Sequence, residues 1–195
     1  FNGSNLIATF AALVAYGFSP SQVASCLGAL PVVPGRLERV PTRYGAVFVD
    51  YAHAPDALRS VLKTVRPLVQ NRLWVVFGCG GDRDPRRRSG MGQAANDEAD
   101  CIVLTSDNPR SEDPDAIVAD IYQHCPKALH RDSRRREAIG YTLSQMEEGD
   151  VVIVAGRGHE SFQEIKGEMI PFSDIAVVRE LVAKQGLAPQ DQVGV

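Results

Sequence analysis

Four segments of the sequence carry the residue types that bind small, charged molecules. They span residues 50–56, 78–88, 105–112 and 156–160, and each is dense in Gly, Asp, Asn, Arg or His directly after an apolar run. In a parallel α/β sheet, ligands bind at the edge where the strands have their carboxyl ends. Because an arbitrary α/β domain does not place such residues after every strand, we expect the four segments to form one site.

The first segment combines a carboxylate with a histidine. Asp50 ends an apolar run, and His53 comes just before a helix that is expected to begin at Pro55. A carboxylate in this place can bind ribose hydroxyls, and a histidine near a helix N-terminus can meet a phosphate. The alternative interpretation is that Asp50 or Asp56 only caps the helix.

The second segment is rich in glycine, which lets the backbone approach a ligand closely. It lacks the third glycine of the dinucleotide fingerprint, and the sequence contains no P-loop of the form G-x-x-x-x-G-K-[ST]. Asp82, Arg83, Asp84 and the run Arg86–Arg88 mix both signs of charge, which suits a zwitterion better than a polyphosphate alone. The alternative is a glycine turn with surface charges.

The third and fourth segments contain the groups that read an amino acid. Asp107 accepts hydrogen bonds from an ammonium, Asn108 supplies a donor and an acceptor, and Arg110 can fork onto a carboxylate. In the fourth segment two glycines again permit close approach, and Glu160 can bind an amine. The alternatives are a turn built on the Asn-Pro pair and an ordinary loop.

The elements that must position these residues follow from the apolar pattern. Apolar strands alternate with helices, which predicts an α/β fold with a Rossmann-like, mostly parallel sheet and flanking helices. A break at Pro31–Gly35 predicts a boundary between an N-terminal helical piece, residues 1–34, and the α/β domain, residues 35–195. Ser4 and Ser173 are expected to cap the first and last helices. Strands are expected over 36–43, 45–50, 73–78, 101–105, 128–130 and 150–155, a hairpin over 162–165 and 168–170, and helices over 4–16, 20–29, 55–65, 87–98, 113–123, 133–146 and 174–184.

Composition excludes several classes of protein. The 195 residues are 44% hydrophobic with a formal net charge of −3, which excludes a disordered chain and argues against a general nucleic-acid binder. No apolar run reaches the roughly 20 residues that span a bilayer, so no membrane insertion is expected. Four separated cysteines without a C-x-x-C pair predict no zinc site and fit a reducing cytoplasm. The run Arg134–Arg136 is expected to form a solvated helix face.

Motifs along essentially the whole chain resemble the Mur ligase family, and most closely its diaminopimelate-adding members. The resemblance implies that residues 1–34 end a central ATPase domain and that residues 35–195 form the C-terminal domain, which binds the incoming amino acid. The UDP-binding domain, the P-loop and the magnesium-binding residues of the family are absent from this sequence, so this chain alone is not expected to catalyse. The matching motifs are Phe1-Asn2-x-x-Asn5, Gly35-Arg36-Leu37-Glu38, Asp50-Tyr51-Ala52-His53-x-Pro55-Asp56, Gly78-Cys79-Gly80-Gly81-Asp82-Arg83-Asp84, Asp107-Asn108-Pro109-Arg110 and Gly156-x-Gly158-His159-Glu160.

The resemblance also implies roles for single residues. Asn5 would lie near the adenine of ATP, while Arg36, Asp50 and His53 would close on ATP from the C-terminal domain. It implies no catalytic residue and no metal ligand in this chain. The amino-acid site would consist of Arg83, Asp107, Asn108, Arg110, Gly156 and Glu160.

Arg110 is the residue that implies the substrate. The family's lysine-adding members lack this arginine, and diaminopimelate carries a second carboxylate that a guanidinium can bind through two hydrogen bonds. A lysine substrate would leave the guanidinium unpaired, at a cost of about 1–3 kcal/mol. Glu160 would hold the distal ammonium. Ala54 and Arg157 stand where the family more often has Thr and Lys, and we expect neither to touch a residue with a direct role.

The implied reaction is an ATP-dependent amide ligation in peptidoglycan precursor synthesis. ATP and Mg²⁺ would convert the carboxylate of UDP-N-acetylmuramoyl-dipeptide into an acyl phosphate, which the amine of meso-diaminopimelate would attack. The sequence does not identify the base, although His159 is a candidate. The alternatives are a lysine-adding ligase, a folylpolyglutamate synthetase, or a non-catalytic module that binds an amino acid or a nucleotide. The missing P-loop favours the module, whereas the start at Phe1 inside a family motif favours a truncated ligase.

Overall fold

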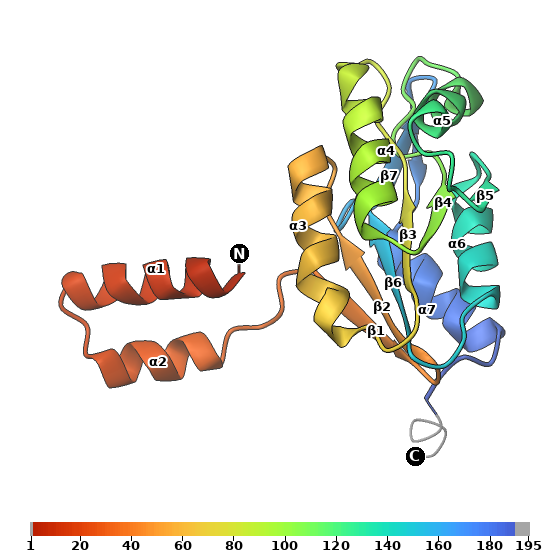
Figure 1. Ribbon diagram of the computed structural model, residues 1–195. Helices are drawn as coiled ribbons and strands as arrows, with labels where there is room; N and C mark the ends of the chain where they lie inside the picture. Colours follow the sequence, from red (N-terminus) through yellow and green to blue (C-terminus); the bar gives the residue numbers. More distant parts are fainter. Residues whose placement is uncertain (1, 190–195) are drawn as a thin grey trace. The chain divides into compact units, whose positions relative to one another are not determined.

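The computed structural model describes residues 2–189 and falls into two compact units, Phe1–Val33 and Pro34–Val195 (Figure 1). The smaller unit is a pair of packed helices, α1 (Asn2–Ala15) and α2 (Pro20–Gly28). Because α1 begins at Asn2, Ser4 lies inside the helix, and its predicted role as the N-cap is wrong. Ser19 does cap α2, since its Oγ accepts a hydrogen bond from the Gln22 amide at 3.3 Å.

The larger unit contains a six-stranded sheet in the order β1-β2-β6-β3-β4-β5, in which only β1 runs antiparallel to its neighbour. This arrangement confirms the predicted α/β fold with a mostly parallel sheet and flanking helices. A separate antiparallel hairpin follows β6. The strands are β1 (Glu38–Thr42), β2 (Gly45–Asp50), β3 (Leu73–Phe77), β4 (Cys101–Leu104), β5 (His130–Arg131), β6 (Asp150–Ala155), β7 (Phe162–Ile165) and β8 (Glu168–Pro171). The helices are α3 (Pro55–Val65), a short 3-10 turn (Arg66–Leu68), α4 (Arg86–Glu98), α5 (Pro114–Gln123), α6 (Arg135–Ser144) and α7 (Asp174–Lys184).

Helices cover both faces of this sheet, which explains why the central strands are apolar throughout (Figure 1). Helices α3, α4 and α5 pack on one face through residues such as Leu58, Met91 and Ile117. Helices α6 and α7 pack on the other face through residues such as Ile139 and Val178. Every residue of β3 and β6 is buried. The sequence signal for these two strands is therefore strong, and β6 has its predicted bounds.

The register of the parallel strands brings the four polar segments to one edge of the sheet. Asp50, the last residue of β2, pairs with Ala155, the last residue of β6, and the ends of β3 and β4 pair in the same way. The strand expected at 128–130 is displaced along the chain, since β5 contains only His130 and Arg131 and Leu129 is exposed.

Candidate functional site

A cavity of about 330 Å³ opens at the carboxyl ends of β2, β3, β4 and β6. Its wall contains one or more residues from each of the four segments that the sequence singled out. Tyr51 and Cys79 also line the cavity, although we had assigned them no role, and so does Arg87 of the basic run Arg86–Arg88. The predicted site residues in the wall are His53, Arg83, Asp107, Asn108, Arg110, Gly156 and Glu160.

Asp107 follows β4 and is only 8% exposed. Its Oδ1 accepts a hydrogen bond from the Asn108 amide at 2.7 Å, whereas its Oδ2 has no partner among the described residues. Gly156, at φ +114°, makes room for this oxygen, because a Cβ there would lie 2.5 Å from Oδ2. Burial raises the pKa of Asp107, although Arg135 and Arg157 pull it back down. A buried acceptor with a free oxygen is suited to an ammonium.

Asn108 and Glu160 lie together in the wall. Asn108 Nδ2 donates to Glu160 Oε2 at 2.9 Å. The Asn108 Oδ1 accepts from Arg157 Nη1 at 2.7 Å, and the same nitrogen lies 3.4 Å from Glu160 Oε2. Our expectation that Arg157 touches no residue with a direct role is therefore wrong. The expectation failed because residues 108 and 157 are far apart in the sequence, and the pairing of strand ends across the sheet brings them together.

Arg110 is held by the hairpin of β7 and β8. Its amide donates to the Glu164 carbonyl at 3.0 Å, its Nε lies 3.2 Å from Glu164 Oε2, and its Nη1 donates to the Gly81 carbonyl at 2.7 Å. Arg110 has a φ of +52°, a left-handed conformation that is strained for a residue with a Cβ. Within the part of the chain that is described, Nη2 has no hydrogen-bond partner, so the guanidinium can still donate hydrogen bonds to a bound anion.

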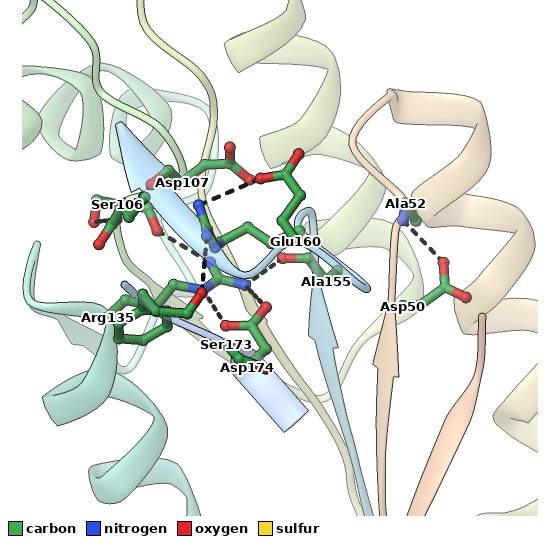
Figure 2. Close-up of polar contacts among 12 residues, drawn as sticks. Asp50, Ala52, Ser106, Asp107, Arg135, Ala155, Glu160, Ser173 and Asp174 are labelled. Atoms are coloured by element: carbon green, nitrogen blue, oxygen red, sulfur yellow. Dashed lines mark hydrogen bonds and ion pairs between the residues drawn. The ribbon is translucent and has the colours of Figure 1, made fainter. Parts of the chain in front are cut away.

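Arg135 ties the carboxyl ends of β4 and β6 to the start of α7 (Figure 2). Its guanidinium donates to the carbonyls of Ser106 at 3.0 Å and Ala155 at 2.9 Å, and it binds both oxygens of Asp174 at 2.7 Å. This side chain has no exposed surface, whereas Arg134 and Arg136 are exposed. The predicted solvated face is thus wrong for Arg135.

Asp50 points away from this cluster (Figure 2). It is 1% exposed, and its two oxygens accept from the amides of Leu37 at 2.8 Å and Ala52 at 2.9 Å. Burial raises its pKa, and these backbone hydrogen bonds act in the opposite direction. The N-cap of α3 is Ala54, and no side chain in the described residues caps that helix, so the interpretation of Asp50 as a helix cap is wrong.

The remaining residues predicted to bind ATP lie in different places. The guanidinium of Arg36 sits over the Tyr51 ring at 5.0 Å from its centre, beside the cavity wall. His53 Nδ1 lies 2.9 Å from the Tyr51 carbonyl oxygen. Asn5 is an exposed residue of α1, in the smaller unit. The structure therefore brings His53 into the cavity wall and places Arg36 at its margin, whereas Asn5 belongs to the smaller unit.

The arginines after β3 have different environments. Arg88 is 7% exposed and pairs with Glu112 at 2.7 Å and Asp120 at 3.2 Å. Arg83 and Arg87 line the cavity, and neither guanidinium makes a hydrogen bond within the described residues, although the Arg87 amide donates to the Asp84 carbonyl at 3.1 Å. Together with Arg110 they supply positive charge to a wall that also holds Asp107 and Glu160. This combination is complementary to an amino acid that carries an additional carboxylate.

Neither a cluster of three or more metal ligands nor a membrane-spanning helix occurs among the described residues. No three His, Cys, Asp or Glu side chains among residues 2–189 gather as ligands for a metal ion. None of the helices in that range combines the length and the apolar character needed to cross a bilayer.

Residues 35–158 match the family model described as "Mur ligase, glutamate ligase domain". A UDP-N-acetylmuramoyl-L-alanyl-D-glutamate–2,6-diaminopimelate ligase from Geobacillus kaustophilus is 45% identical over 95% of this chain and 39% of its own length. A solved structure of a ligase with the same name is 44% identical, with a TM-score of 0.75 over 95% of this chain and 39% of the solved one. E. coli FolC in complex with ADP is 24% identical, with a TM-score of 0.63 over 78% of this chain and 36% of its own, and shows the fold alone. The chain spans about two fifths of the length of the curated relatives it matches.

Proposed function

This chain belongs to the Mur ligase family, and from that premise we propose that it is the C-terminal part of an ATP-dependent ligase. The proposed reaction adds meso-diaminopimelate to UDP-N-acetylmuramoyl-L-Ala-D-Glu during peptidoglycan precursor synthesis. In this proposal residues 35–195 bind the amino acid, and residues 1–34 end the central ATPase domain. One observation carries it: the cavity combines the free Arg110 Nη2 with the unpartnered Oδ2 of Asp107.

In this proposal the wall of the cavity selects diaminopimelate. One end of this molecule carries both an ammonium and a carboxylate that are not joined in the new bond. Asp107 and Glu160 bind the ammonium, and Arg110 binds the carboxylate, with Arg83 as a second cation. Asn108 supplies a further donor. Since binding energy at this end holds the opposite amine near the reacting carbonyl, it lowers the barrier through proximity.

The reaction itself requires groups from outside this chain. The carboxylate of the dipeptide attacks the γ-phosphorus of ATP, which forms an acyl phosphate and releases ADP. The amine of diaminopimelate then attacks the acyl carbon, loses a proton, and expels inorganic phosphate. We assign Arg36 and His53 to the ATP side of the closed enzyme, with Asn5 near the adenine. Asp50 also belongs to the ATP side, where its carboxylate positions the backbone by accepting hydrogen bonds from the amides of Leu37 and Ala52. No step is assigned to Mg²⁺ in this chain.

The alternatives make different demands on the same cavity. A lysine-adding ligase would leave Arg110 without a ligand carboxylate, which costs about 1–3 kcal/mol in a desolvated site. A non-catalytic module would bind the amino acid without ATP turnover. A folylpolyglutamate synthetase would use glutamate, which has no second amine for Glu160.

The test is ADP release by the full-length protein that carries this chain, with ATP, Mg²⁺ and the UDP-linked dipeptide. We expect release with meso-diaminopimelate and none with L-lysine or L-glutamate. Arg110→Ala should lower kcat/KM for diaminopimelate about 10- to 100-fold, in keeping with the loss of a charged hydrogen bond. Arg134→Ala is the matched control, because the side chain of this arginine is 75% exposed and its partner among the described residues, Asp132, lies outside the cavity wall. Release with lysine would overturn the substrate, and no release with any amino acid would overturn the ligase.

A further inference from the structure

Arg157 is a buried cation directly behind the cavity wall. Its side chain has no exposed surface, and it is not among the residues that line the cavity. Nevertheless it contacts two residues that do line it, Asn108 and Glu160. A bound ligand would therefore not touch Arg157, and any influence of this residue on binding must pass through its neighbours.

The first neighbour is Asn108, whose amide Arg157 orients. Two donors converge on Asn108 Oδ1, namely Arg157 Nη1 at 2.7 Å and the Glu164 amide at 3.0 Å. Turning the amide over would place its NH₂ group against both donors, which is unfavourable. The observed orientation directs Nδ2 to Glu160 at 2.9 Å.

The second neighbour is Glu160, whose carboxylate Arg157 fixes. Asn108 Nδ2 and Arg157 Nη1 both approach the same oxygen, Oε2, at 2.9 Å and 3.4 Å. The other oxygen, Oε1, receives no hydrogen bond from the described residues. One oxygen of Glu160 is thus used for positioning, and the other is left for a ligand in the cavity.

Arg157 is itself anchored at the hairpin. Its Nη2 donates to the carbonyls of Phe162 at 2.5 Å and Phe172 at 3.4 Å, and its guanidinium lies over the Phe172 ring at 5.6 Å. A guanidinium can serve these acceptors and Asn108 at once, because its donors point in fixed, separate directions. A lysine has a single ammonium nitrogen, which could not reach all of these acceptors at once.

We propose that Arg157 is a positioning residue that holds Asn108 and Glu160 in the orientation that binds the ammonium group at the non-reacting end of the incoming amino acid. The identity of that amino acid rests on the proposed function. The position of Arg157, anchored on one side and in contact with both wall residues on the other, makes the site rigid before the ligand arrives. Removing the guanidinium therefore weakens binding of the amino acid and leaves the other substrates unaffected.

The test compares Arg157→Met and Arg157→Lys with the wild type in the full-length enzyme. For Arg157→Met we expect KM for meso-diaminopimelate to rise about tenfold or more, with KM for ATP and for the UDP-linked dipeptide within about twofold. Arg157→Lys should recover part of the loss, since an ammonium can still reach one acceptor. Arg136→Met is the matched control, because that arginine lies on α6 and its guanidinium pairs, within residues 2–189, with Glu180 alone.

A merely structural role would give a different result. It would lower the temperature of unfolding and kcat while leaving KM for diaminopimelate unchanged, or it would raise all three KM values together, and either result overturns the proposal. Crystal structures of the wild type and Arg157→Met provide a readout that needs no substrate. We expect the Asn108 amide and Glu160 to change orientation in the variant, and unchanged positions would overturn the proposal. If the wild type shows no turnover with diaminopimelate, the proposed function fails, and the crystal structures still decide the role of Arg157.

Discussion

Two buried carboxylates at opposite ends of the sheet have opposite surroundings. Asp150 begins β6, is fully buried, and accepts five hydrogen bonds, three from Arg72 and one each from the Trp74 ring and the Glu147 amide. Asp107 follows β4 at the other end and accepts one hydrogen bond, with its second oxygen unpartnered within the described range. One carboxylate is satisfied by the protein, and the other is not.

Their ionisation follows from this difference. Burial by itself raises the pKa of both groups. For Asp150, the hydrogen bonds from Arg72, the Glu147 amide and the Trp74 ring outweigh burial and hold the pKa below its ordinary value. For Asp107, burial prevails and the pKa is raised. Asp107 therefore lowers the stability of the fold at neutral pH, and it lies in the cavity wall. For these two reasons we assign Asp107, and not Asp150, to the binding of a ligand.

The largest effect is expected at the satisfied end. Asp150→Ala removes the acceptor for five hydrogen bonds and leaves Arg72 without its main partner. Breaking a buried pair of this kind lowers the free energy of unfolding by about 3 kcal/mol. Urea unfolding followed by the fluorescence of Trp74, the single tryptophan of the chain, measures it. A loss below about 1 kcal/mol, the range of a surface ion pair, would show that the comparison is mistaken.

A substitution of Asp107 is expected to change the free energy of unfolding in the opposite direction. Asp107→Asn removes a poorly stabilised charge and keeps an oxygen for the Asn108 amide, so the free energy of unfolding should rise by about 1 kcal/mol. In the full-length enzyme the same substitution should reduce kcat/KM for the amino acid about 10- to 100-fold, because the ammonium loses its anion. Asp56→Asn is the matched control, since this aspartate lies outside the cavity wall. A destabilised Asp107→Asn would show that the protein, and not a ligand, satisfies this group.

The sequence was sufficient to predict the edge of the sheet at which the cavity lies. Apolar runs fixed the strands, and the rule for parallel sheets then assigned the four polar segments to one edge, where the cavity lies. Helices α3 and α7 have their predicted bounds, because a proline and a serine mark where they begin. These features depend on local patterns, which a single sequence displays.

The sequence did not reveal the residues that support the wall. Arg135 was hidden in a basic run, although it lies three, four and seven residues before Ala138, Ile139 and Thr142, which are all buried. That spacing is the apolar stripe of α6, and it was the one available signal for a buried arginine. The contacts of Arg157 and Glu164 could not be predicted, because they depend on how the hairpin packs against the strand ends.

The pH dependence of stability separates the two carboxylates further. The pKa of Asp107 is raised above its ordinary value of 3.8, so this group favours the folded state below that pH, and the contribution is lost as pH rises through the folded pKa. The pKa of Asp150 is lowered, so its contribution is present above 3.8 and is lost as pH falls through the folded pKa. The advantage of Asp107→Asn over the wild type should therefore grow as pH rises from about 4 to 7. Urea unfolding across this range measures it, and an advantage that shrinks would contradict the raised pKa.

The smallest effect is expected at Glu164, which stands between the two extremes. Its carboxylate lies 3.2 Å from Arg110 Nε, and both side chains are partly exposed, at 38% and 22%. Glu164→Gln keeps the backbone hydrogen bonds that this residue makes with Asn108 and Arg110, so only a screened charge is lost. We expect a change of about 0.5 kcal/mol, seen as a roughly twofold rise in KM for diaminopimelate. A rise of about tenfold would instead show that Glu164, like Arg157, positions the residues of the cavity wall. The region on which ligand binding depends would then extend from Asp107 to the hairpin.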